Sequence, residues 1–287
     1  MPDTIPAHFT TEFSTNWGER VQQTKGRLDA WVEDESFMGE RKRYDRIGSQ
    51  NSMRRTERKG PTRIVDPELD SRWAYRASYD LANLLDKDDA VNLGALTLPT
   101  SPYIKSHTNA YHRDSDDIAW HGALDDVMTG DAGATATPLP ASQKIAAGGT
   151  GLTLAKLITA NQILEDADLE DDSPRVLCVT AEQLTNLLNT TQVQDADFNT
   201  VRALASGTVD SFMGFKFVKI KRLPKVGTTR SCPGWVKGAI KRIKGAMWSS
   251  IDKRADLSYS TQIYSAWHLG STRVYDEGVV QIDCTEI

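Results

Sequence analysis

Three histidines between residues 107 and 121 are the side chains in this sequence best suited to bind a metal ion. His107, His112 and His121 stand near Asp116 in a stretch whose other residues favour a helix. Ligands on one face of a helix are separated by three, four or seven residues. The histidines here are separated by five and nine residues, so the three imidazoles point in different directions. We therefore expect no metal site in this stretch.

Other patterns that could support catalysis are also incomplete. The glycine-rich stretch AAGGTGLTLAKL, residues 146–157, lacks the spacing of a phosphate-binding loop and is interpreted as a linker between two helices. Carboxylates are paired at 116–117 and 125–126, but neighbours in sequence do not face each other on a helix. There is no G-x-S-x-G motif. We expect no catalytic residue and no cofactor, and we predict that the chain is not an enzyme.

The length and composition are those of an ordinary globular protein. The chain has 287 residues, of which 39% are hydrophobic, enough for one large domain or two small ones. No apolar run approaches the roughly 20 residues that span a bilayer. Residues 1–15 lack the basic and apolar regions of a secretion signal, so we expect folding in the cytosol and no membrane partner.

The three cysteines show no spacing typical of a zinc site or a disulfide framework. Cys178 and Cys284 each occur in an apolar, strand-like run, where a free cysteine acts as a small hydrophobic residue. Cys232 stands beside Pro233 and Gly234 and is predicted to lie in a loop.

Charge is unevenly distributed along the chain. The net charge is -5, which argues against a dedicated nucleic-acid-binding protein. Residues 41–63 are nevertheless strongly basic, and residues 165–172 are strongly acidic. Charge blocks of this kind often form interaction surfaces.

The remaining patterns predict a mixed α+β chain. Residues 38–80 are turn-rich and end in alternating aromatic and polar residues, which predicts a long hairpin. Ser101 and Pro102 favour the start of a long helix that ends near Gly130, with a loop over 131–151. Thr180 with Gln183 forms a capping-box start for another helix. Further predicted elements are helices at 152–167 and 237–244 and strands at 176–179, 262–266 and 279–284. The stretch SFMGFKFVKIKRLP, residues 211–224, predicts another strand, with a bulge at Val218 and its end at Pro224.

The order of these features resembles that of the major capsid proteins of tailed bacteriophages, the Johnson fold. Two stretches carry the resemblance most clearly. The first extends from VLCVTAEQLTNLL through DADFNTVRALASGTVDSFMGFKFVKIKRLP, in which a strand and a helix lead to a strand that begins with "G-F". The second is the closing stretch KRADLSYSTQIYSAWHLGSTRVYDEGVVQID, with its "GVV" strand. The resemblance covers residues 150–287 by local pattern and the earlier residues by layout.

The resemblance implies a Johnson-fold capsid subunit that self-assembles into the icosahedral head shell around double-stranded DNA. Its implied parts are an N-terminal arm (1–37), an extended loop (38–80), a peripheral domain (81–180 and 261–287, with a spine helix at 102–128) and an axial domain (181–260). The implied partners are copies of the chain in pentamers and hexamers, a separate scaffolding protein, the portal, a decoration protein and weakly bound packaged DNA. Such a protein is assembled in the host bacterial cytoplasm and resides in the virion.

Two groups of residues are expected to contact other subunits. Trp17 and Trp31 are predicted to anchor the arm on an adjacent subunit, since the arm has no core of its own. Basic residues of the loop are predicted to engage acidic residues such as Asp168 and Asp171. These basic residues are Arg41, Arg43, Arg54, Arg55 and Arg58. The alternatives are the shell of an encapsulin-like nanocompartment and, from another class, a nucleic-acid-processing enzyme.

Overall fold

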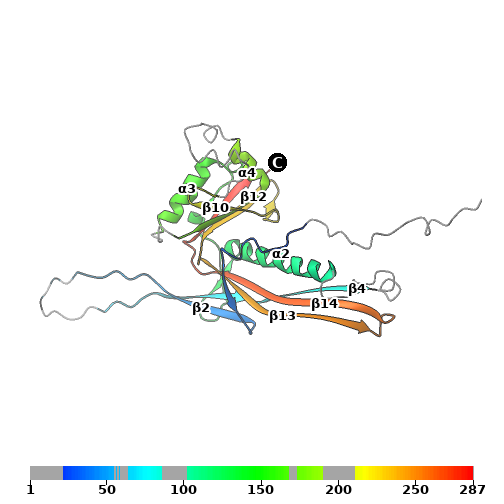
Figure 1. Cartoon of the computed structure of the whole chain (residues 1–287). Helices are drawn as coiled ribbons and strands as arrows, with labels where there is room; N and C mark the ends of the chain where they lie inside the picture. The colour runs from blue at the N-terminus through cyan, green and yellow to red at the C-terminus, as the bar shows by residue number, and fades with distance from the viewer. Residues whose placement is uncertain are drawn as a thin grey trace, which may run out of the picture. The chain divides into compact units, whose positions relative to one another are not determined.

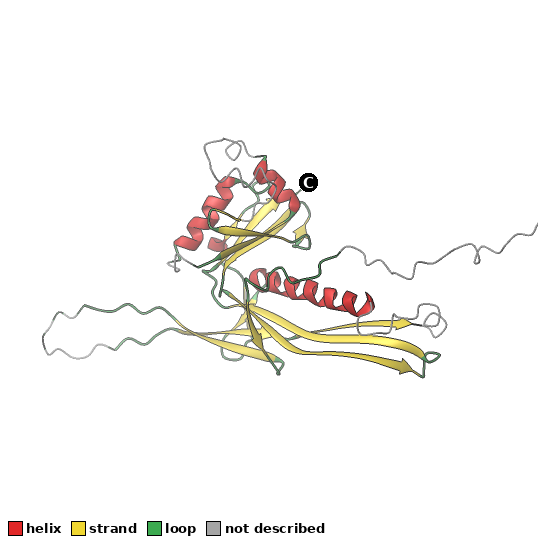
Figure 2. Cartoon of the chain, in the orientation of Figure 1, coloured by secondary structure: helices red, strands yellow, loops and turns green. Residues whose placement is uncertain are grey.

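The computed structural model describes residues 22–54, 56, 58, 64–85, 102–167, 173–189 and 211–286 (Figures 1 and 2). The chain divides into two compact units. One comprises Met1–Lys25, Tyr79–Arg113 and Met247–Trp267, and the other comprises Gly26–Ser78, Asp114–Ala246 and His268–Ile287. Within the described residues, no helix has the length and apolar character needed to cross a membrane.

A seven-stranded mixed sheet forms the main core of the larger unit. Its order is β7 (Lys144–Ile145), β15 (Val279–Thr285), β12 (Thr229–Val236), β8 (Arg175–Val179), β10 (Phe215–Lys219) and β9 (Ser211–Phe212), with β11 (Lys225–Val226) beside β12. Every residue of β8 is buried, as a short apolar run between two strands predicts. The sheet combines strands that the sequence analysis assigns to the peripheral and axial domains.

Two helices lie against this sheet, and both begin where the sequence predicts (Figure 1). In α3 (Leu154–Glu165), the Thr153 hydroxyl accepts a hydrogen bond from the Lys156 N–H. In α4 (Ala181–Leu188), Thr180 accepts from the N–H of Gln183. A capping hydroxyl satisfies one of the backbone donors that a helix start leaves free. The predicted helix after Thr180 is confirmed, as is the strand at 176–179.

The predicted loop at 131–151 holds more structure than expected. It contains β6 (Thr135–Thr137), a 3₁₀ turn (Ala141–Gln143) and β7. The buried Lys156 ammonium donates to four backbone carbonyls, those of Ala147, Thr150, Gly151 and Asp283, at 2.8–3.0 Å. The glycine-rich linker is therefore fixed to β15 by charge-assisted hydrogen bonds.

The extended hairpin is confirmed. Strand β2 (Arg41–Ile47) pairs antiparallel with β3 (Leu69–Tyr75), and the register runs from Arg41 opposite Tyr75 to Ile47 opposite Leu69. This ladder continues through β5 (Val127–Thr129) and β6 into a four-stranded sheet.

The long helix α2 (Pro102–Leu124) begins at Pro102 as predicted, while Ser101 lies outside the described residues. Its predicted end at 128–130 is wrong, because Val127–Thr129 forms β5 and pairs with Thr135–Thr137. In the smaller unit, the Nδ1 atom of buried His107 lies 2.8 Å from the Ser265 hydroxyl. His121, in the other unit, is exposed and stacks on Trp120.

A third sheet has the order β1 (Glu33–Ser36), β13 (Ile240–Arg254), β14 (Ser260–Arg273) and β4 (Ala77–Leu85). Strands β13 and β14 pair as a long ribbon (Figure 2). The predicted helix at 237–244 is wrong. Ile240 and Ile243 are three residues apart, as on a helix, but the intervening Arg242 is also fully buried because acidic residues of β1 and the preceding turn bind it.

The cysteines are buried in strands. Cys178 and Cys284 lie in β8 and β15, as predicted. The predicted loop position of Cys232 is wrong, because this residue lies in β12. Pro233 is tolerated in β12 because the pairing of β12 with β8 begins only at Gly234. Gly234 itself lies close to β8, since a Cβ added there would be 3.0 Å from the Leu177 side chain.

Candidate inter-subunit surfaces

The base of the extended loop is bound to its own chain through an arginine-aromatic stack. The guanidinium carbons of Arg41 and Arg43 lie 4.7 and 5.8 Å from the centroid of the Trp73 ring. Arg41 also donates to the Ala132 carbonyl at 3.1 Å, and Arg43 pairs with Asp131 at 3.1 Å. Two of the arginines predicted to contact another subunit are thus placed against a turn of the same chain.

This turn is fitted closely to the hairpin. The Trp73 indole donates to the Gly130 carbonyl at 2.7 Å, and the Tyr75 hydroxyl donates to the Gly133 carbonyl at 2.8 Å. Gly133 has a φ of 67°, and a Cβ there would lie 2.8 Å from both aromatic side chains. Glycine is required at this position by both backbone conformation and space.

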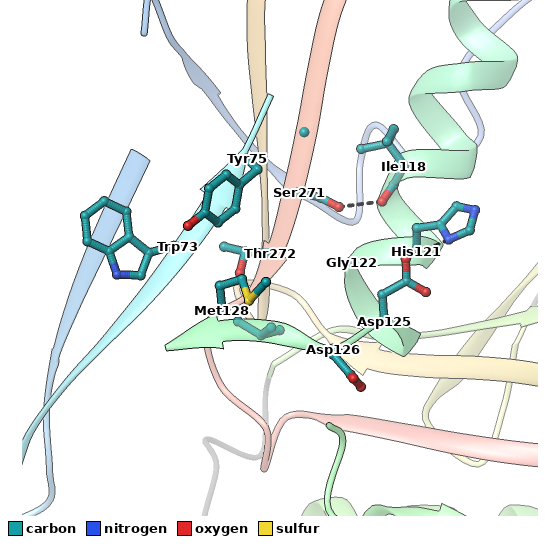
Figure 3. Close-up of a pocket in the computed structure, with 12 residues that line it drawn as sticks. Trp73, Tyr75, Ile118, His121, Gly122, Asp125, Asp126, Met128, Ser271 and Thr272 are labelled. Carbon is teal, nitrogen blue, oxygen red and sulfur yellow. Dashed lines mark hydrogen bonds and ion pairs between the residues drawn. The ribbon is translucent and has the colours of Figure 1, made fainter. Parts of the chain in front are cut away.

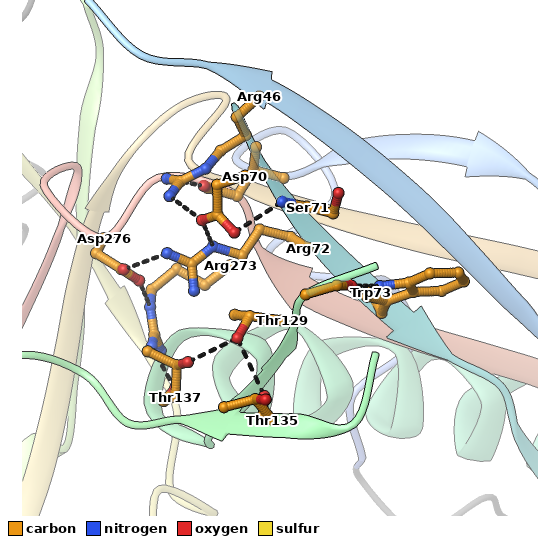
Figure 4. Close-up of polar contacts among 12 residues, drawn as sticks. Arg46, Asp70, Ser71, Arg72, Trp73, Thr129, Thr135, Thr137, Arg273 and Asp276 are labelled. Atoms are coloured by element: carbon orange, nitrogen blue, oxygen red, sulfur yellow. Dashed lines mark hydrogen bonds and ion pairs between the residues drawn. The ribbon is translucent and has the colours of Figure 1, made fainter. Parts of the chain in front are cut away.

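A buried charge network fixes the opposite face of the hairpin (Figure 4). Arg72 pairs with Asp276 at 2.7 Å, Arg273 pairs with the same carboxylate, and Arg46 pairs with Asp70 at 2.6 Å. The Arg72 and Arg273 side chains are 5% and 0% exposed, so their charges must be satisfied within the protein. The orientation of the loop at its base is therefore set by the chain itself.

The distal part of the loop has a different character. Five large apolar side chains there are exposed, namely Ile47, Met53, Ile64, Val65 and Leu69. Arg54 and Arg58 are also exposed, and neither makes an ion pair with any described residue. Arg55 lies outside the described residues. Exposed apolar side chains with unpaired charges beside them are typical of an interaction surface.

Residues 27–31, within the C-terminal part of the arm, are held on the larger unit. The buried carboxylate of Asp116 accepts hydrogen bonds from the backbone N–H groups of Arg27 and Leu28, each at 3.0 Å. Trp31 is partly buried against the main core, and its carbonyl accepts from the Trp235 indole at 2.9 Å. This predicted anchor therefore packs on its own chain, while Trp17 lies outside the described residues.

Ion pairs join β1 to β13. Arg242 pairs with Asp29 and Asp34, each at 2.6 Å, and Lys244 also pairs with Asp34 at 2.6 Å. Burial would raise the pKa of Asp34, but hydrogen bonds and charges from Arg242 and Lys244 outweigh it and lower this pKa below 3.8. The hydrogen bond from Lys42, opposed by burial and aided by Lys241, lowers the pKa of Glu35 below 4.5. The carboxylates are therefore stabilised in their charged form.

The predicted acidic partners, Asp168 and Asp171, lie outside the described residues. Glu165, at the edge of that acidic block, lies 3.6 Å from Arg175 of its own chain.

A pocket that the sequence analysis did not identify lies beside the end of α2 in the larger unit (Figure 3). Its cavity volume is about 360 Å³. Tyr75, Met128 and Ile118 line it together with the polar residues His121, Asp125, Asp126 and Thr272. In the sequence, Asp125 and Asp126 form a pair of neighbours that do not face each other on a helix. The signal that could have drawn attention to them is their position just after a helix C-terminus, which already carries partial negative charge.

Comparison with known proteins identifies the family. The family model for phage capsid protein matches residues 5–286. A search of curated proteins finds no match. A structure from Mycobacterium phage Che8 is 16% identical with a TM-score of 0.74, and the alignment covers 98% of each chain. The capsid of cyanophage P-SCSP1u is 14% identical, with a TM-score of 0.66 over 96% of this chain and 93% of that one.

A gene transfer agent supplies a third similar structure. The capsid of the native GTA particle is 9% identical, with a TM-score of 0.66 over 96% of this chain and 95% of that one. At such low identities the structural matches establish the fold, which is the α+β Johnson fold predicted from the sequence. Because the family model covers nearly the whole sequence, the chain belongs to the phage capsid protein family, whose members are structural subunits of the phage head shell.

Proposed function

We propose that copies of this chain join into pentamers and hexamers through the extended loop, and that these capsomers close an icosahedral shell around the double-stranded DNA of a tailed phage. The observation that carries the proposal is the exposed distal loop. Ile64 and Val65 are exposed there without apolar cover, and Arg54 and Arg58 make no ion pair with any described residue. A neighbouring copy can supply those partners, and small contributions then add up over many copies.

The predicted parts of the subunit keep their roles in this proposal. Residues 1–37 act as the arm and 38–80 as the extended loop. The division of the rest into a peripheral domain, 81–180 with 261–287, and an axial domain, 181–260, stays a prediction. So do the contacts of Trp17 and Trp31 with an adjacent subunit and those of the loop arginines with Asp168 and Asp171.

The proposal includes partners beyond the chain itself. A separate scaffolding protein guides assembly, a portal occupies one vertex, and a decoration protein can bind outside. Packaged DNA contacts the inner surface only weakly, because a net charge of -5 does not favour a polyanion. Assembly takes place in the host bacterial cytoplasm, and the subunit acts without catalysis.

Electron microscopy tests this proposal directly. The chain is expressed with and without the scaffolding protein of its phage, and the particles are imaged by negative stain. Closed polyhedral shells, or rings of five and six subunits, are the expected result. A monodisperse monomer under every condition would contradict it. A shell that forms without scaffold and captures an enzyme would instead favour the nanocompartment alternative.

A further inference from the structure

The pocket beside the end of α2 has the chemistry of a receptor for a cationic side chain. Asp125 and Asp126 are exposed at its rim. His121 holds one oxygen of Asp125 at 3.0 Å, whereas Asp126 makes no ion pair with any described residue.

An unsatisfied buried hydroxyl gives an independent indication that the pocket takes a ligand. Thr272 lines the pocket and is 2% exposed, yet its Oγ1 atom has no hydrogen-bond partner among the described residues. A buried polar atom without a partner is unfavourable, so native proteins usually supply one. Tyr75 adds an aromatic ring to the wall, which can stack on a planar cation (Figure 3).

The arginine nearest in sequence to this site is already committed. Arg273 is fully buried, pairs with Asp276 and donates to the backbone carbonyls of Ala123 and Asp125. It shares the Asp276 carboxylate with Arg72, and it makes no ion pair with the Asp125 or Asp126 carboxylate.

We propose that this pocket receives an arginine from the extended loop of a second copy of the chain, Arg54 or Arg58. A guanidinium matches the chemistry of the lining because it can pair with a carboxylate, stack on an aromatic ring or donate to a hydroxyl. In the described part of the loop, Arg41, Arg43 and Arg46 are bound within their own chain, while Arg54 and Arg58 are exposed and unpaired. This inference rests on the proposed shell function and names the receiving site, which for the arginine concerned replaces Asp168 and Asp171 as the partner.

Charge reversal tests the pairing. Asp126→Arg places a cation at the rim and is expected to lower the yield of closed shells by about tenfold, since like charges then meet at every copy of the contact. Glu277→Arg is the matched control, because Glu277 is an exposed carboxylate in a turn of the same unit and makes no ion pair with any described residue. This control should assemble normally.

The compensating variants decide the partner. Asp126→Arg combined with either Arg54→Asp or Arg58→Asp should restore shells, because the opposite charges then meet in exchanged positions. If neither double variant recovers assembly while both remain folded by circular dichroism, the assignment is wrong. An Asp126→Arg chain that assembles like the wild type would also overturn it.

A cryo-electron microscopy map of the wild-type shell gives the direct readout. The expected density in the pocket is a guanidinium from a neighbouring loop. An empty pocket, or one filled by another segment or another protein, contradicts the inference while leaving the shell function intact. Failure of the wild-type chain to form any shell would contradict the proposed function itself, so the two failures are distinguishable.

Discussion

The buried charge of Arg242 contributes to the stability of the folded subunit. Its side chain is fully buried, pairs with Asp29 and Asp34 and donates to the Ser115 carbonyl at 3.0 Å. We predict that Arg242→Ala lowers the free energy of unfolding of the unassembled subunit by about 2 kcal/mol. This figure is below that for a fully buried pair because both carboxylates remain partly exposed. Urea unfolding followed by circular dichroism measures the change.

The exposed pair of Arg254 and Asp256 supplies the control for this prediction. Both side chains are more than 40% exposed, and surface ion pairs contribute little to stability. Arg254→Ala should therefore leave the urea midpoint unchanged. Equal destabilisation by the two substitutions would contradict the importance given to burial.

Gly133 allows a second test at the scale of one residue. Gly133→Ala combines a positive φ with a Cβ that would lie 2.8 Å from Trp73 and Tyr75. We predict a loss of about 2 to 3 kcal/mol, measured by thermal unfolding. Gly130→Ala is the matched control, since Gly130 also has a positive φ, 84°, but nothing lies within 4 Å of the added carbon. Its loss should be about 1 kcal/mol. Equal losses would mean that backbone strain alone accounts for the effect.

The loop arginines show that sequence reveals the chemistry of a site but not its long-range contacts. The sequence identifies Arg41, Arg43, Arg54 and Arg58 as one basic block, because their chemistry is the same. The structure separates them. Arg41 and Arg43 meet Trp73 and the 130–133 turn, which are at least 30 residues away in sequence, so only the strand register brings them together. Long-range pairing of this kind leaves no local pattern, and this also explains why the pocket was missed.

Among the elements, β1 is attached to β13 by charge more than by apolar contact. The lowered pKa values of Asp34 and Glu35 mean that folding favours their charged forms. The stabilisation is therefore complete above their ordinary values of 3.8 and 4.5 and is lost as the pH falls through the lowered values. We predict that β1 detaches in this acid range. A fluorophore attached through Ser36→Cys should then show falling anisotropy.

The labelling is specific because the three native cysteines are buried. Asp34→Asn with Glu35→Gln supplies the comparison, since neither amide can lose or gain the relevant proton. This variant should give low anisotropy already at neutral pH and little further change in acid. If the wild type and the variant follow the same acid profile, other groups control the detachment.

Local sequence signals predicted the starts of two helices correctly but failed for two segments that form strands. Proline and the capping threonine fixed the starts of α2 and α4, because those signals act within one turn of the helix. The predicted end of α2 and the predicted helix at 237–244 were wrong, because both segments form strands whose partners lie elsewhere in the sequence. Tertiary pairing can override a helical spacing of only two isoleucines.

At the scale of the whole molecule, the chain satisfies its own charges at the base of the loop, whereas Arg54 and Arg58 in the distal part make no ion pair with any described residue. The network of Arg72, Arg273 and Asp276 fixes the direction of the hairpin. The base of the hairpin therefore does not have to become ordered when the distal side chains contact another subunit. Preorganisation of this kind reduces the entropy lost on association.

The loop should therefore be separable from the fold but not from assembly. We predict that replacing residues 49–67 with a short Asn-Gly turn leaves the thermal unfolding midpoint of the subunit within a few degrees of the wild type and abolishes closed shells. A two-residue turn can join the shortened strands because the Gly48 N–H already donates a hydrogen bond to the Glu68 carbonyl at 2.7 Å. The described residues of 49–66 are exposed, so their removal takes no side chain from the core. Scanning calorimetry and negative-stain microscopy measure the two properties.

A full-length loop with Met53, Ile64 and Val65 replaced by serine distinguishes apolar contact from reach. These side chains are 61%, 85% and 46% exposed, so the serine variant loses little in the free subunit. Burial at an interface contributes roughly 25 cal/mol for each Å² of apolar surface, and every subunit repeats the contact. The serine variant should consequently assemble poorly although its loop retains its length. Closed shells built from the shortened chain would show that subunits join through other surfaces, and shells from the serine variant alone would show that charge and reach suffice.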